Sequence, residues 1–299
     1  MKYAKKSLLV VLSGLMCLAL IAACGSKSTP TPAAPVAEAT EAPKVTEATE
    51  APQGESAISL SGSTTVQPLA EKLAEAFMAA NAGVRIDVQG GGSSVGVKAA
   101  GEGTSDIGMA SRDVKDTEMT EFPNLQVFVI ARDGIAIVAH PEVPVGDLTV
   151  DQVRDIFSGK TTNWKDVGGE DQSIILVSRE EGSGTRAAFE EMVMGKETVI
   201  AATAILQPSN GSVRTTVSTT PYSIGYLSFG YLEESVKALS IGGVAPTEPN
   251  AADGTYPIVR PLNMLTNGEP TGAVKQFLDF ILSEAGQKMV VEDGYIAVK

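Results

Sequence analysis

The strongest constraint on the fold is one pattern that recurs four times along the chain. Each time, a short apolar segment leads into a loop of small polar residues and then into polar or helix-like sequence. The loops lie at 61–65, 90–94, 111–112 and 178–185. Short apolar segments bounded by turn residues are typical of buried strands. Because strands and helices alternate, the sequence predicts an α/β fold with mainly parallel sheets, in which such loops converge at the carboxyl ends of the strands.

The fourth loop has the residues best suited to holding a small oxyanion. Its glycines let backbone N–H groups approach a ligand closely, and the helix that follows favours negative charge at its N-terminus. Ser183 and Thr185 add hydroxyl donors, and Arg179 adds a permanent positive charge. An ordinary capped turn uses the same small residues, so the prediction of an oxyanion pocket depends on the four loops taken together.

The first 56 residues have the pattern of an export signal and a tether. Three lysines precede an apolar run that ends in small residues just before Cys24, as in a bacterial lipoprotein signal. The run is shorter than the ~20 residues of a membrane-spanning anchor, which is the alternative. We therefore predict a signal peptide over 1–23 and, over 24–56, a lipidated Cys24 with a disordered tether of Thr, Ala, Pro and Glu. The mature protein would be extracytoplasmic and lipid-anchored to the cell membrane.

Composition excludes several classes of partner. The net charge of −13 argues against nucleic acid, which requires a broad basic face. Any anion site must therefore act locally. With two cysteines, one of them inside the predicted signal peptide, and one histidine, the chain shows no disulfide framework and no metal-ligand spacing. We expect neither a metal nor a cofactor.

Two enzymatic interpretations are weaker. The glycines of 91–96 have the spacing of a P-loop, but Val97 and Lys98 stand where Lys and Ser or Thr are required. The Gly-Ser-Gly around Ser183 is not a nucleophile elbow, and His140 is the one histidine that could act as its base. We expect no enzyme, with a secreted hydrolase using Ser183 as an alternative.

Six segments in one order carry a resemblance to a known family. They are SGSTTVQP at 61–68, GGSSVGV at 91–97, DIGMASR at 106–112, DIFSG at 155–159 with Asn163-Trp164, Arg179 with GSGT at 182–185, and IGY at 224–226. With this set the chain resembles the phosphate-binding lipoproteins of high-affinity phosphate ABC transporters. The resemblance covers nearly all of residues 57–299.

The resemblance implies a type II periplasmic-binding-protein fold, in which two α/β lobes joined by crossover strands close on the ligand. Lobe I would comprise 57–139 plus 259–299, and lobe II would comprise 140–258. The implied function is an extracytoplasmic solute-binding protein, expected to be a monomer. It would capture inorganic phosphate by lobe closure and deliver it to the permease of an ABC transporter.

Ligand contacts follow from the resemblance position by position. Lobe I would contribute Ser63, Thr64, Thr65, Ser93, Ser94, Ser111 and Arg112, and lobe II would contribute Arg179, Ser183, Gly184 and Thr185. Glu181 would hold Arg179 in place.

One position departs from the family pattern. Where some members carry an aspartate that accepts the proton of phosphate and repels sulfate, this chain has Ser111, followed by Arg112. A hydroxyl can accept that proton but does not repel sulfate as a carboxylate does. A receptor for another oxyanion, such as sulfate or molybdate, is therefore an alternative. Arg112 is either a second cationic ligand, which we favour, or a solvent-exposed neighbour.

Overall fold

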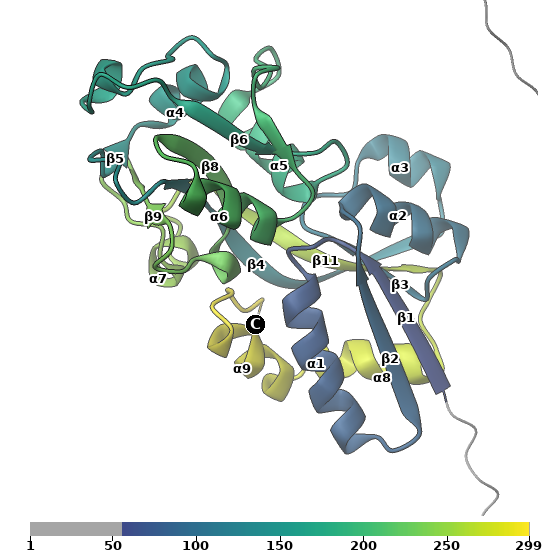
Figure 1. Cartoon of the computed structure of the whole chain (residues 1–299). Helices are drawn as coiled ribbons and strands as arrows, with labels where there is room; N and C mark the ends of the chain where they lie inside the picture. The colour runs from purple at the N-terminus through teal and green to yellow at the C-terminus, as the bar shows by residue number, and fades with distance from the viewer. Residues whose placement is uncertain (1–55, 299) are drawn as a thin grey trace, which may run out of the picture. The chain divides into compact units, whose positions relative to one another are not determined.

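The structure of the protein, a computed structural model, describes residues 56–298 (Figure 1). The predicted signal peptide, Cys24 and all but the last residue of the predicted tether lie outside these residues. Among the helices of 56–298, none combines the length and the apolar character needed to cross a membrane.

The first group of elements consists of three parallel strands, each followed by a helix. Strand β1 (Ser56–Gly62) lies between β2 (Val84–Gly90) and β3 (Ile107–Ala110). The helices are α1 (Gln67–Ala80), α2 (Ser93–Glu102) and α3 (Asp116–Glu121). Helix α1 has a proline in its first turn, where the missing N–H is tolerated, and it buries Leu69, Leu73 and Phe77 along one face. These elements confirm the first three predicted units.

The second group repeats the arrangement around β6. Strand β6 (Ile175–Arg179) pairs in parallel with β7 (Ile205–Gln207) and β8 (Ser223–Ser228). Helix α5 (Gly184–Phe189) continues as a π-helix over Glu190–Met194, and α6 (Asn210–Thr219) follows β7. The smaller elements are β5 (Asp147–Leu148), α4 (Val150–Phe157), β9 (Lys237–Ala238), β10 (Ser240–Ile241), α7 (Glu248–Ala252) and the 3-10 helices Trp164–Val167 and Phe229–Tyr231.

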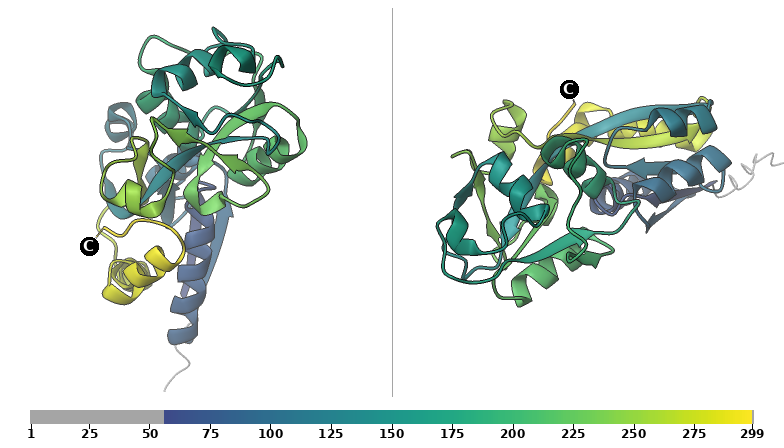
Figure 2. Two further views of the ribbon diagram at one scale, coloured as in Figure 1. Left: turned by 90° about the vertical axis from the view of Figure 1, so that its left-hand side faces the viewer. Right: turned by 90° about the horizontal axis from the view of Figure 1, so that it is seen from above.

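Two long strands connect the groups. Strand β4 (Leu125–Ala139) and strand β11 (Val259–Asn267) are antiparallel over the whole length of β11, with a bulge between Leu262 and Asn263. The strand order is β2-β1-β3-β11-β4-β8-β6-β7, with β9 also on β4. Figure 1 shows β4 and β11 passing side by side from one group to the other, and Figure 2 shows them from two further sides. The apolar stretch 128–140 thus lies on one strand up to Ala139.

The two larger hydrophobic clusters lie at opposite ends of β4. One contains Ile130 and Ala131 together with β1, β3, α1 and the C-terminal helices α8 (Gly272–Ile281) and α9 (Glu284–Glu292). The other contains 135–139 together with β6, β8 and the helices around them. The division between the clusters falls at 132–134, where an Arg-Asp-Gly sequence interrupts the apolar run of β4. The structure therefore has the two α/β lobes of a periplasmic-binding-protein fold.

Candidate functional site

The four predicted loops meet where the two lobes face each other. The hydroxyl oxygens of Thr65 and Thr185 lie 3.1 Å apart, and those of Ser93 and Ser111 lie 3.4 Å apart. The backbone N–H of Ser94 donates to the carbonyl of Gly182 across the lobes at 3.1 Å. The buried hydroxyl residues at this junction are Ser63, Thr65, Ser93, Ser111, Ser183 and Thr185. Polar side chains are rarely buried together without a bonding role, so this hydroxyl cluster is the candidate site.

At Gly184 the backbone of one lobe lies directly against side chains of the other. A Cβ atom at this position would lie 2.1 Å from Ser93 Oγ and 2.6 Å from Ser111 Oγ. Any residue larger than glycine would therefore push the first-lobe hydroxyls away from the loop of the second lobe. The glycine of this Gly-Ser loop is needed for the close contact.

Helix starts supply part of the local electrostatics. Ser183 caps α5 by accepting a hydrogen bond from the backbone N–H of Arg186 at 3.2 Å, and Ser93 is the first residue of α2. The Ser63 hydroxyl accepts from the backbone N–H of Thr65 at 3.1 Å, just before α1. Unpaired N–H groups and the helix dipole make such positions favourable for negative charge.

Arg179 reaches across the junction from the end of β6. Its side chain is 1% exposed, and its guanidinium donates to both oxygens of Glu180, at 3.0 and 2.9 Å. It also donates to Thr64 Oγ1 at 3.3 Å. The carboxylate that pairs with Arg179 is therefore Glu180 and not the expected Glu181. Glu180 directly follows the last residue of β6, so its carboxylate lies beside the guanidinium, whereas Glu181 begins the exposed turn that follows.

Arg112 is buried and paired. Its guanidinium donates to both oxygens of Glu118, at 2.7 and 2.8 Å, and to Ser94 Oγ at 3.3 Å. Burial alone would raise the pKa of Glu118, but the hydrogen bonds from Arg112 and from the Lys115 backbone outweigh it and lower this pKa. Arg112 is not a solvent-exposed neighbour, because its side chain is 4% exposed and lies next to a predicted ligand.

Three buried polar residues next to the hydroxyl cluster were not predicted from the sequence: Asp133, Asn210 and Arg260. Arg260 of β11 and Asp133 of β4 form an ion pair at 2.9 Å, and both side chains are at most 1% exposed. Burial raises the pKa of Asp133, against the opposing effect of Arg260. Both residues interrupt apolar strand sequence, and a charge in a buried strand requires a partner. That signal could have identified them, whereas Asn210 offered none.

A polar cavity of about 370 Å³ adjoins the cluster. It is lined by four predicted residues, Ser94, Arg112, Glu181 and Ser183, and by Lys115, Gly182, Arg186, Ala187 and Glu190. Residues of both lobes therefore form its wall, and cationic side chains predominate over the two glutamates. Within 56–298, no group of three or more His, Cys, Asp or Glu residues is placed to hold a metal ion.

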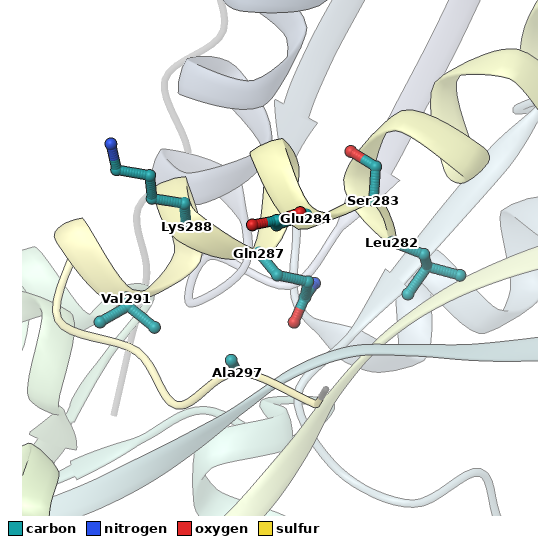
Figure 3. A pocket seen from close by; sticks show the side chains of 7 residues that line it. All are labelled: Leu282, Ser283, Glu284, Gln287, Lys288, Val291 and Ala297. Atoms are coloured by element: carbon teal, nitrogen blue, oxygen red, sulfur yellow. The ribbon is translucent and has the colours of Figure 1, made fainter.

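A second cavity, of about 510 Å³, lies beside α9 (Figure 3). It is lined by Leu282, Ser283, Glu284, Gln287, Lys288, Val291 and Ala297, none of them a predicted site residue. The amide of Gln287 is already bonded to the carbonyls of Ile130 and Ile281 and to the N–H of Val298. Because this cavity lacks convergent free polar groups, we place the candidate site at the lobe junction.

Known proteins are similar to this chain over most of its length. The model of the PBP superfamily domain matches residues 37–285. The phosphate-binding protein PstS of Bacillus subtilis is 40% identical over 249 residues, which is 82% of each chain. A phosphate ABC transporter substrate-binding protein from Clostridium perfringens, solved with bound phosphate, is 43% identical with a TM-score of 0.79, and the match covers 81% of this chain and all of that one. An ABC-type phosphate transport receptor from Vibrio cholerae is 38% identical with a TM-score of 0.68, over 80% and 99% of the chains.

The two-lobed fold, with a polar site where the lobes meet, defines a solute-binding protein of the PBP superfamily. Within that superfamily, the chain belongs to the family of the phosphate-binding proteins named PstS.

Proposed function

We propose that the protein captures inorganic phosphate outside the cytoplasm by closing its two lobes and delivers the anion to the permease of an ABC transporter. The observation that carries this proposal is the convergence of buried hydroxyls and Arg179 from both lobes on one junction. The names of its relatives support phosphate as the ligand. Because the donors are divided between the lobes, the closed arrangement satisfies the anion from both sides, so the ligand favours closure.

The proposed ligand set follows the family positions. It comprises Ser63, Thr64, Thr65, Ser93, Ser94, Ser111 and Arg112 from the lobe of 57–139 and 259–299, and Arg179, Ser183, Gly184 and Thr185 from the lobe of 140–258. A dehydrated phosphate needs many donors in place of water, and charge-assisted hydrogen bonds are the strongest of these. Arg179 supplies the charge, while the hydroxyls and the backbone N–H groups of the loops supply the directional contacts.

Calorimetric titration of the purified protein with phosphate, sulfate, molybdate and arsenate tests the ligand. We expect submicromolar phosphate binding. Heat from sulfate or molybdate with none from phosphate would refute phosphate as the ligand. Such a result would instead favour the second candidate, a receptor for another oxyanion, for which the absence of a carboxylate at Ser111 is the specific observation.

The proposed localisation depends on Cys24. With the lipid on this residue, the predicted tether would let the folded lobes reach the permease from the membrane surface. Metabolic labelling with a radioactive fatty acid should mark the wild-type protein and leave a Cys24→Ser variant unmarked. Equal labelling of both would contradict lipidation at this cysteine.

The protein is further proposed to act as a monomer and to have no enzymatic activity. Sedimentation should give the mass of one chain with and without phosphate. A chromogenic phosphate ester or acyl ester should not be hydrolysed, whereas turnover that disappears in a Ser183→Ala variant would favour the secreted hydrolase.

A further inference from the structure

The hydrogen bonds around Asn210 have a fixed direction. Its Oδ1 accepts from the backbone N–H of Ser228 at 3.3 Å, and its Nδ2 donates to Thr65 Oγ1 at 2.8 Å. A backbone N–H can only donate, so the amide atom that faces Ser228 is the oxygen. The amide nitrogen must therefore face Thr65, because turning the side chain over would lose the bond from the Ser228 N–H.

Arg260 donates to two hydroxyls of the same cluster. Its Nη2 lies 3.1 Å from Thr65 Oγ1, and its Nη1 lies 3.3 Å from Ser111 Oγ and 3.0 Å from the Ser111 carbonyl oxygen. A guanidinium has donors and no acceptor. Both hydroxyl oxygens therefore accept from it.

A rigid frame holds these two donors. Arg260 donates to Asp133 Oδ2 at 2.9 and 3.2 Å, and Asp133 Oδ1 accepts from the hydroxyl of Ser228 at 3.0 Å. Ser228 thus bonds to Asn210 through its backbone N–H and to Asp133 through its hydroxyl. Ser228, at the end of β8, therefore holds Asn210 directly and Arg260 through Asp133.

The result is that Thr65 Oγ1 has both of its acceptor positions filled by N–H donors. Its single proton has one remaining use, which is donation to an acceptor in front of it. In this structure the neighbouring atom is Thr185 Oγ1 at 3.1 Å. If Thr185 accepts this hydrogen bond, the hydroxyl proton of Thr185 becomes the one that can be donated to a ligand. One of the two threonine hydroxyls is therefore a donor to the ligand, whether Thr65 donates to Thr185 or to the ligand itself.

We propose that Asn210 and Arg260 are positioning residues that fix the direction of the Thr65 hydroxyl, so that this corner of the site can only donate hydrogen bonds. The inference rests on the proposed function and identifies the form of ligand oxygen that the corner accepts. An unprotonated ligand oxygen binds next to the Thr65 hydroxyl, whereas the protonated oxygen of hydrogen phosphate must face a different part of the site. The side chain of Asp133 is not the acceptor for that proton, because each of its oxygens already accepts two hydrogen bonds.

A double-mutant cycle between Asn210→Asp and Thr65→Val, measured by calorimetry with inorganic phosphate, tests the proposal. An aspartate at 210 presents an acceptor where Asn210 presented a donor, so Thr65 turns its proton away from the ligand. Thr65→Val removes the hydroxyl at nearly constant volume. We expect each single variant to weaken binding about 10- to 100-fold, the range for one hydrogen bond to a charged group. The double variant should bind within about threefold of Thr65→Val, because the affected hydroxyl is already gone.

Two further variants separate hydroxyl direction from charge and from folding. Gln287→Glu makes the corresponding change at another buried amide, which bonds to the carbonyls of Ile130 and Ile281 and to none of the proposed ligand residues. Its phosphate affinity should remain within about threefold of wild type, because no hydroxyl of the cluster is reversed. Thr65→Ser should restore most of the affinity lost in Thr65→Val. Circular dichroism of every variant should match that of the wild type.

The outcomes of the cycle are distinct from those of the proposed function. Tight phosphate binding by the wild type with multiplicative losses in the cycle, or an equal loss in Gln287→Glu, would overturn the positioning role alone. Wild-type binding of another oxyanion with no binding of phosphate would refute phosphate as the ligand, and the same cycle is then measured with that anion. Failure to bind any oxyanion would remove both proposals.

Discussion

Arg179 and Arg260 are both almost completely buried at the lobe junction, but their surroundings differ. The carboxylate partner of Arg260, Asp133, is 0% exposed, and both residues lie on the crossing strands. The partner of Arg179, Glu180, is 33% exposed, and the same guanidinium extends to Thr64 in the opposite lobe. One arginine belongs to the framework that joins the lobes, whereas the other lies at the contact between them.

This difference predicts which substitutions change the stability of the protein and which change its affinity for the ligand. A fully buried ion pair costs much desolvation, and removal of one partner leaves an uncompensated charge. A pair with one exposed partner loses little when that partner is removed, because water replaces it. We therefore expect substitutions around Arg260 to act first on folding and those around Arg179 to act first on the ligand.

The largest expected effect is on the stability of Asp133→Ala. Removing this carboxylate leaves Arg260 buried without a counterion, which should lower the free energy of unfolding by about 3–5 kcal/mol. Urea unfolding followed by circular dichroism measures the change. The matched variant Glu180→Ala should lose about 1 kcal/mol or less, because its carboxylate is partly solvated. Equal losses in the two variants would remove the distinction between the arginines.

Arg179→Ala should act mainly on affinity. If Arg179 supplies the charge that a buried phosphate requires, its loss should weaken binding by about 2–5 kcal/mol. Calorimetry with phosphate measures this. As a control, Arg154→Ala removes an arginine of α4 that pairs with the exposed Asp151 and should leave the dissociation constant unchanged. An unchanged constant in Arg179→Ala would contradict the assigned role.

Gly184→Ala tests whether close approach of the lobes is needed as well as charge. The added methyl would lie 2.1 Å from Ser93 Oγ, so the lobes should close incompletely. Overpacking of this kind typically costs about 1–3 kcal/mol, equivalent to about 5- to 150-fold in affinity. Gly211→Ala, where the nearest atoms lie 3.8 Å from the added methyl, should bind phosphate as the wild type does. Equal affinity of both variants would show that the contact at Gly184 is not needed for binding.

Local pattern was enough to predict the elements and the meeting of the four loops at the candidate site. Alternating apolar segments and Gly/Ser loops gave the strand–loop–helix units. The order of six motifs gave the family. Because loops at the carboxyl ends of parallel strands converge, the hydroxyls of Thr65, Ser93 and Thr185 could be placed together before the structure was known.

Residues that act through distant partners could not be predicted in this way. Arg260 bonds to Asp133 because β11 and β4 are neighbours, and the sequence separation of 127 residues conceals this pairing. Asn210 contacts Thr65 across 145 residues. For Arg179, the wrong choice between two adjacent glutamates arose because chain position does not show where β6 ends and the exposed turn begins.

The smallest expected effect concerns Arg112, the third buried arginine, whose partner Glu118 is 16% exposed and thus intermediate between the other two. The pKa of Glu118 is lowered from its ordinary value of 4.5 in the folded protein, chiefly because its hydrogen bonds from Arg112 and the Lys115 backbone outweigh burial. A carboxyl group with a lowered pKa stabilises the folded protein at pH values above its pKa in the unfolded chain, and this contribution is lost as the pH falls through its pKa in the folded protein.

Glu118→Gln keeps the acceptor for the Lys115 N–H but removes the charge. At neutral pH it should lower the free energy of unfolding by about 1 kcal/mol, and the difference from wild type should shrink below about pH 4.5. Urea unfolding of both proteins between about pH 3 and pH 7 measures it, and a difference that does not change with pH would show that the charge on Glu118 contributes nothing to holding Arg112.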